Sequence, residues 1–184
     1  MASLYLMGFM GTGKSAVSRH LARDLDLSLL DLDHEIEHLT GSSITNFFAS
    51  HGETAFRAIE TRALESTIGK TAVISLGGGV PTQEINREIL KNLARTGHLV
   101  VYLQARPATL AYRIRRQPGK RPVIDGNGYL DYDGTRKRVA ELLEQRDPWY
   151  RECANYLVNT DDRNIEDIAE DIAGEWRRRS EIIS

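Results

Sequence analysis

The chain has 184 residues, of which 41% are hydrophobic and 27% charged, and its formal net charge is -2. This length fits a single domain spanning residues 1–184, and the near-neutral charge argues against a nucleic-acid-binding surface. Cys153 is the only cysteine, which excludes an internal disulfide and a disulfide-stabilised secreted scaffold. No apolar run approaches the length of a membrane span and no signal-peptide pattern opens the chain, so we expect a cytoplasmic protein without membrane contact.

Short apolar segments alternate with longer segments of helical periodicity. The apolar segments predict strands at residues 4–7, 27–32, 72–76, 99–103 and 156–158, and their nearly continuous apolar character predicts that helices cover both faces of the sheet. This alternation is typical of an α/β fold, a three-layer α/β/α sandwich around a five-stranded parallel sheet. Apolar stripes mark three of the helices: Val17, Leu21 and Leu25; Ile85, Ile89 and Leu93; and Ile165, Ile168, Ala169 and Ile172.

A glycine-rich segment follows the first predicted strand. It reads Gly8-x-x-x-x-Gly13-Lys14-Ser15, which matches the P-loop pattern in the strand–loop–helix context that the pattern requires. Glycines let the backbone turn its N–H groups toward phosphate oxygens, Lys14 can reach the β- and γ-phosphates, and the Ser15 hydroxyl can ligate Mg²⁺. The alternative is a glycine-rich turn with a solvated lysine. The chain has no Asn-Lys-x-Asp sequence for reading guanine, so ATP is preferred over GTP.

Two aspartates follow the second predicted strand. Asp31 and Asp33 are two residues apart, so on a strand their carboxylates would point the same way, at the sheet edge where ligands collect in α/β folds. Asp31 can hold Mg²⁺, directly or through water, and Asp33 can accept or orient a substrate hydroxyl. The alternatives are a solvated strand end for Asp31 and a helix N-cap for Asp33.

Three further segments carry candidate site residues with an ordinary structural alternative for each. Gly77-Gly78-Gly79 ends the third strand and either admits a substrate or forms a turn, and Glu53 and Arg57 have the i,i+4 spacing of a surface ion pair. Arg146 lies inside a predicted helix, where ion pairing would also explain it. Residues 117–128 are rich in Pro, Gly and Asn and predict a mobile loop.

Taken in order, these segments resemble the shikimate kinases, a family of small P-loop enzymes similar in fold to nucleoside monophosphate kinases. The resemblance runs from about residue 4 to residue 170. It rests on the ordered spacing of the segments, because most of them are unspecific alone. The segments are GFMGTGKS, Asp31-Leu32-Asp33 with Ile36-Glu37, Gly52-Glu53 with Phe56-Arg57 and Glu60, Leu76-Gly77-Gly78-Gly79, Arg121-Pro122, and Arg146 with Tyr150.

The resemblance implies Mg²⁺-dependent transfer of the ATP γ-phosphate to the 3-hydroxyl of shikimate, on the route to chorismate. It implies a helical substrate-binding segment at about 33–62 and a lid at about 117–130. The sequence does not reveal the oligomeric state, and a monomer is the default expectation. The catalytic residues would be Lys14, Asp33 and Arg121, and the metal ligands Ser15 and Asp31. The substrate would be bound by Asp33, Arg57, Gly78, Gly79 and Arg146, and the nucleotide by Gly11, Thr12, Gly13, Lys14, Ser15, Ala16, Arg116, Arg121 and Arg163.

Some roles stay open at this point. The arginine that stacks on adenine could be Arg113, Arg115 or Arg116, with Arg116 preferred, and Asp33 either takes the hydroxyl proton or only orients the hydroxyl. A related small-molecule kinase, such as a gluconate or nucleoside monophosphate kinase, is the enzymatic alternative. A nucleotide-binding module without catalytic activity is the alternative from another class, against which the intact Lys14, Ser15 and aspartates argue.

Overall fold

The computed structural model describes residues 2–116, 124 and 130–183, and within them a five-stranded sheet. Its strand order is β2-β3-β1-β4-β5, and every neighbouring pair is parallel. The first strand of the chain therefore lies at the centre, and the loop that follows it opens in the middle of the sheet edge. The strands are β1 (Leu4–Gly8), β2 (Ser28–Asp31), β3 (Ala72–Ser75), β4 (Leu99–Gln104) and β5 (Tyr156–Asn159).

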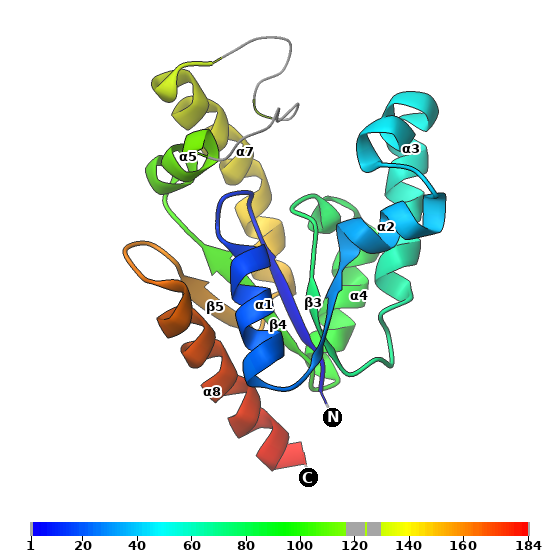
Figure 1. Cartoon of the computed structure of the whole chain (residues 1–184), viewed down its shortest axis with the longest axis vertical. Coiled ribbons are helices and arrows are strands. Elements are labelled where there is room, and N and C mark those ends of the chain that lie inside the picture. The colour runs from blue at the N-terminus through cyan, green and yellow to red at the C-terminus, as the bar shows by residue number, and fades with distance from the viewer. Residues whose placement is uncertain (1, 117–123, 125–129, 184) are drawn as a thin grey trace.

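Helices cover both faces of the sheet and complete the predicted three layers (Figure 1). One face carries α1 and α8, and the other carries α3, α4 and α7. At the carboxyl ends of the strands, α2 and α3 stand on one side of the loop after β1, and α5 and the start of α7 stand on the other. The helices are α1 (Lys14–Asp24), α2 (Leu32–Thr40), α3 (Ile44–Glu65), α4 (Glu84–Arg95), α5 (Pro107–Arg116), α7 (Tyr132–Cys153) and α8 (Ile165–Ile183), with a 3-10 turn η1 (Val80–Thr82).

The central strand shows why the sequence builds two cores. Leu4 and Leu6 point to the core shared with α1 and α8, whereas Tyr5 and Met7 point to the core shared with α3, α4 and α7. Both faces are fully buried, as the nearly continuous apolar sequence predicts. That prediction is wrong for the edge strands: β2 has no fully buried residue and β5 has only Val158, because each edge strand has a neighbour on one side only.

Two local predictions are also corrected. β2 ends at Asp31 and α2 begins at Leu32, so Asp33 lies in the first turn of a helix rather than on a strand. The N-cap of this helix is Asp31, which accepts a hydrogen bond from the backbone N–H of Asp33. In α4 the apolar stripe is shorter than predicted, since Ile85 at its start is 56% exposed.

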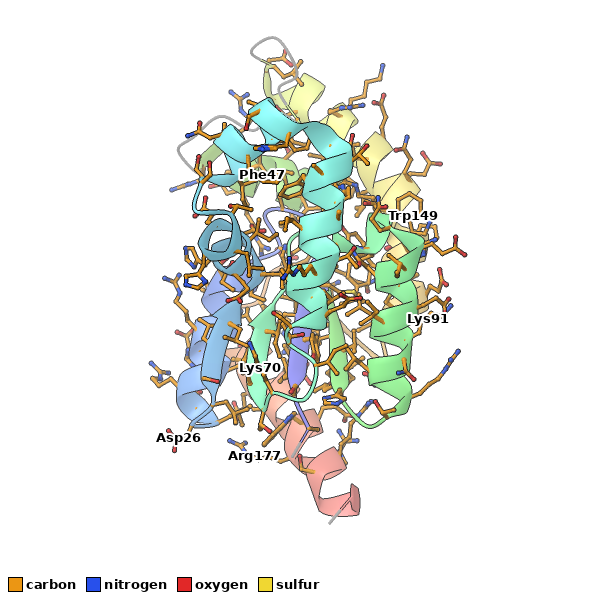
Figure 2. All side chains as sticks on the ribbon, turned by 90° about the vertical axis from the view of Figure 1, so that its right-hand side faces the viewer. Asp26, Phe47, Lys70, Lys91, Trp149 and Arg177 are labelled. Atoms are coloured by element: carbon orange, nitrogen blue, oxygen red, sulfur yellow. The ribbon has the colours of Figure 1, made fainter. Side chains whose placement is uncertain are left out.

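Helix α3 has a break at Gly52, whose φ of 77° and ψ of 178° are not helical. The segment before the break carries Phe47 and the segment after it carries Arg57; Figure 2 looks onto this helix and shows Phe47 near its upper end. Only glycine takes this conformation at little cost. The break lets the first segment lean over the sheet edge while the second packs against the core.

The single cysteine closes α7. Cys153 is buried in the core beside α4, and this burial raises the pKa of its thiol to about 12. No thiolate forms at neutral pH, so Cys153 is a structural residue. Among the helices of the described residues, none is long and apolar enough to cross a bilayer.

Candidate active site

A cavity of about 830 Å³ opens at the carboxyl ends of the strands. Its wall combines the loop after β1, the start of α2, the middle of α3, the glycines after β3 and one arginine of α7. Parallel α/β sheets bind ligands at this edge. The predicted site residues that line it are Gly11, Gly13, Lys14, Ser15, Ala16, Asp31, Asp33, Arg57, Gly78, Gly79 and Arg146.

The loop between β1 and α1 has the backbone of a phosphate cradle. A Cβ on Gly8 would lie 2.5 Å from the carbonyl oxygen of Leu103, so no larger residue fits between the central strands there. Gly13 has a φ of 95° and is the N-cap of α1, which directs the positive end of this helix into the cavity. Thr12, which was also predicted for the nucleotide, is buried and does not line the cavity, and its side chain donates to the Phe9 carbonyl.

Lys14 is the cation of this loop. Its Nζ donates to the carbonyl oxygens of Gly8 and Phe9 at 2.7 and 3.0 Å. Burial lowers the pKa of Lys14 to about 8, against the opposing charges of Asp33 and Asp31. Because it is held by carbonyl groups rather than by a carboxylate, the ammonium group is available to an incoming anion.

The two aspartates of the pocket have different environments. Asp31 caps α2 through one oxygen, while Asp33 lies exposed to the cavity. Desolvation by the surrounding protein raises the pKa of Asp33, the charge of Asp31 adds to this, and Lys14 opposes it. A carboxylate with a raised pKa accepts a proton more readily than an ordinary aspartate.

Two arginines line the cavity, and they have different partners. Arg57 donates from Nη1 to Glu60 at 2.8 Å and from Nη2 to Glu53 at 3.4 Å, and its buried Nε has no hydrogen-bond partner among the described residues. Arg146 lies over the ring of Phe9, at 5.8 Å from the centroid. Within the described part of the chain, no carboxylate lies within ion-pair distance of Arg146. The ion pair that was the ordinary explanation of Arg146 is therefore not seen.

Glu60 is a pocket residue that received no role from the sequence. Its side chain is only 3% exposed, and desolvation raises its pKa while Arg57 opposes this. Its carboxylate accepts a hydrogen bond from the guanidinium of Arg57 and so fixes the orientation of that group. The i,i+3 spacing of the two residues was the available signal, but the same spacing occurs on any solvated helix.

The glycines after β3 give room to the charged side chains around them. A Cβ on Gly77 would lie 3.0 Å from Oδ1 of Asp33, and a Cβ on Gly79 would lie 2.7 Å from Nη1 of Arg57. The sequence suggested that the missing side chains admit a substrate to the backbone. In the structure they also let Asp33 and Arg57 occupy their positions.

We therefore predict that Gly79→Ala moves Arg57 without unfolding the protein. The added methyl meets the end of a flexible side chain rather than backbone, so the guanidinium shifts while the fold holds. An anionic substrate held by Arg57 should then show a KM raised by about 10-fold, as expected for a displaced charged hydrogen bond. Steady-state kinetics check this, and an unchanged KM would contradict it. Gly174→Ala is the matched control, since a Cβ there meets nothing within 4 Å.

Among the described residues, two arginines predicted for the nucleotide, Arg116 and Arg163, do not line the cavity. Arg116 is exposed and donates to the Tyr112 hydroxyl at 2.6 Å, and Arg163 pairs with Asp171 at 3.1 Å. Arg113 is closer to the phosphate loop, because it donates to Gly11 O and to Thr160 O. Arg121 and the predicted lid at about 117–130 fall outside the described residues, except for Ile124 and Leu130.

Ser15 and Asp31, the two predicted metal ligands, lie in the same cavity. Within residues 2–116, 124 and 130–183 no group of three His, Cys, Asp or Glu side chains forms a metal cage. Ser15 is exposed at the first turn of α1 and Asp31 keeps one carboxylate oxygen free of its capping bond, and both line the cavity. Such a sparse oxygen set fits Mg²⁺, which takes few protein ligands when phosphates and water supply the rest.

Three apolar residues that were not predicted as site residues line the pocket. Ile44, Phe48 and Phe56 line the wall formed by α3, and Phe48 is 41% exposed. Phe56 belongs to a segment that carries the family resemblance, whereas Ile44 and Phe48 have the spacing of any amphipathic helix, so no sequence signal set these two apart.

Comparison with known proteins places the chain in a family. A sequence model described as shikimate kinase matches residues 10–176. A shikimate kinase of Thermus thermophilus is 42% identical over 177 residues, covering 96% of this chain and 90% of that protein. The structure of shikimate kinase from Acinetobacter baumannii in complex with shikimate aligns with a TM-score of 0.81 at 39% identity, covering 94% of this chain and 90% of that one. A shikimate kinase from Bacteroides thetaiotaomicron aligns with a TM-score of 0.82 at 28% identity, over 98% of both chains. The chain therefore belongs to the shikimate kinase family.

Proposed function

We propose that this chain transfers the γ-phosphate of ATP to the 3-hydroxyl of shikimate, giving shikimate 3-phosphate and ADP. The observation that carries the proposal is the pairing of two anion-binding regions in one cavity. The loop of Lys14 suits a polyphosphate, and the guanidinium groups of Arg57 and Arg146 suit a small carboxylate. Family membership supports the same assignment.

The nucleotide is assigned to the loop between β1 and α1. The backbone from Gly11 to Ala16 would hold the phosphates, and Lys14 would leave its carbonyl partners to contact the β- and γ-phosphates. Ser15 and Asp31 would hold Mg²⁺, which neutralises charge on the phosphates when bound. Of the arginines considered for adenine, Arg113 rather than Arg116 contacts the phosphate loop, through the carbonyl oxygen of Gly11. The roles of Arg121 and Arg163 at the nucleotide stay predictions.

The acid is assigned to the opposite wall. Arg57 and Arg146 both line the cavity, and Arg146 has no carboxylate partner among the described residues, so both guanidinium groups can donate to a substrate carboxylate. Asp33 would accept the hydrogen of a ring hydroxyl, and the backbone at Gly78 and Gly79 would border the ring. Ile44, Phe48 and Phe56 would cover its apolar face.

Phosphoryl transfer then needs mainly alignment and charge neutralisation. The 3-hydroxyl oxygen forms a bond to the γ-phosphorus while the bond to the β–γ bridging oxygen breaks, and ADP leaves with that oxygen. The hydroxyl proton passes to Asp33, whose raised pKa suits it to receive a proton, and afterwards to solvent. Lys14 stabilises the charge that develops on the transferred group.

The test is ADP release measured across a panel of shikimate, gluconate and nucleoside monophosphates. We expect turnover with shikimate as the best substrate. Turnover that is best with another member would reassign the chain to a related kinase, and ATP binding without transfer to any of them would favour the non-catalytic alternative. The monomeric state and the cytoplasmic location stay predictions from the sequence.

A further inference from the structure

A buried tyrosine lies directly behind the glycines of the active site. Tyr150 is 1% exposed, and its ring stacks on that of Tyr102 with the centroids 4.8 Å apart. It does not line the cavity. Its hydroxyl donates to the carbonyl oxygen of Gly78 at 2.5 Å, and the nearby guanidinium of Arg146 acts to lower the pKa of the same hydroxyl. One oxygen thus joins the two parts of the site that come from β3 and from α7.

This bond sets the orientation of one peptide plane. The described residues contain no cis peptide bond, so the Gly78 carbonyl and the Gly79 N–H point in opposite directions. Because the carbonyl is turned back toward Tyr150, the Gly79 N–H is turned away from it. That N–H has no backbone acceptor within the described part of the chain. Gly79 itself lines the cavity.

The same hydroxyl also bears on Arg146. No carboxylate of the described residues lies within ion-pair distance of this guanidinium. It lies over the Phe9 ring and close to the Tyr150 hydroxyl. Burial raises the pKa of Tyr150 to about 12, so the hydroxyl stays protonated over the working pH range and remains a donor. Gly78 is also close to the phosphate loop, since a Cβ on it would lie 3.3 Å from the carbonyl oxygen of Gly8 and 3.8 Å from the Tyr150 hydroxyl.

We propose that Tyr150 is a positioning residue for the acceptor acid, which fixes the Gly78–Gly79 peptide and the Arg146 guanidinium relative to each other so that both donate to the bound acid. The inference rests on the proposed function for the identity of the acid. It assigns to Tyr150 no contact with the substrate and no part in proton transfer.

The test compares two hydroxyl deletions in the same ring stack. Tyr150→Phe removes the bond to Gly78 and keeps the ring. Tyr102→Phe is the matched control, because Tyr102 is equally buried and donates at 2.8 Å to Asp147, which does not line the cavity. We expect Tyr150→Phe to raise the KM for the acid by about 10-fold and to leave the KM for ATP unchanged, whereas Tyr102→Phe changes neither.

A merely structural role would lower stability in both variants and would not separate the two KM values. An unchanged KM for the acid in Tyr150→Phe, an equal rise for ATP, or the same rise in Tyr102→Phe would overturn the inference. The acid used is the one that the wild-type chain turns over best in the substrate panel. If another compound of the panel is the best substrate, the proposed function is contradicted, but the role of Tyr150 can still be tested with that compound.

If Tyr150→Phe does not fold, the wild-type chain supplies the second measurement. The amide resonance of Gly79 is followed by NMR while the acid is added. A downfield shift of its proton, larger than that of the Gly97 amide in the loop before β4, is expected for a new hydrogen bond. No shift at Gly79 under saturating acid would overturn the inference.

Discussion

Lys14→Ala is expected to lower kcat by about 10²–10³-fold, the loss seen when one preorganised donor to developing charge is removed. Among the described residues, Lys14 Nζ donates to backbone carbonyl groups and pairs with no carboxylate, so the ammonium group is available to the transferred phosphate. The fold should survive, because the substitution removes only the hydrogen bonds from Lys14 to the Gly8 and Phe9 carbonyl groups, at the edge of the cavity. The measurement is kcat at saturating ATP and acid, with far-UV circular dichroism to check folding.

Lys70→Ala is the matched control for this prediction. Lys70 is an exposed lysine just before β3, at the end of the sheet opposite the active site, and Figure 2 shows it below α3. It should leave kcat unchanged. Retention of wild-type kcat in Lys14→Ala would contradict the assignment of the phosphate loop, and loss of secondary structure in that variant would show that the lysine holds the loop together instead.

Arg57→Ala is expected to raise the KM for shikimate by about 10²-fold or more and to leave the KM for ATP nearly unchanged, since it removes at least one charged hydrogen bond to the carboxylate. It also leaves Glu60 buried without its 2.8 Å partner, so we expect a loss of about 1–3 kcal/mol in the free energy of unfolding. Steady-state kinetics and urea denaturation measure the two effects separately.

A double variant separates substrate binding from stability. Arg57→Ala with Glu60→Gln removes the unpaired carboxylate, so the free energy of unfolding should recover while the KM for shikimate stays high. Recovery of the KM in the double variant would show that Arg57 acts only through Glu60. An equal rise in the KM for ATP and for shikimate would contradict the placement of Arg57 at the acid.

The fold could be predicted because its signals are local and strong. The buried strands are continuous apolar runs, and the Gly8-to-Ser15 pattern needs a strand before it and a helix after it, so the α/β class and the five strands are confirmed. The order of the strands could not be predicted, since nothing in a single strand says which neighbour it pairs with. The exposure of β2 and β5 follows from that order.

The residues expected to contact the ligands could be predicted from the sequence, whereas the residues that hold them in position could not. Lys14, Asp33, Arg57 and Arg146 stand out because charged residues beside glycines or inside apolar segments need an explanation, and all four line one cavity. Glu60 and Tyr150 act on other protein groups, and their spacing is ordinary for a helix. Asp31 and Asp33 both line the cavity, as predicted, but they do not share one face of a strand. Asp31 is the N-cap of α2, so Asp33 already lies in the first turn of that helix.

The buried thiol at the end of α7 makes the chain convenient for site-directed spectroscopy. With its sulfur packed against α4 and its pKa near that of a phenol or above, Cys153 will not compete for a maleimide or nitroxide reagent at neutral pH. A pair of cysteines introduced on the outer surfaces of α3 and α5 would therefore carry the only labels in the molecule. Distances between those labels would report whether α3, which lines the cavity, and α5, on the other side of the phosphate loop, move relative to each other when each substrate arrives.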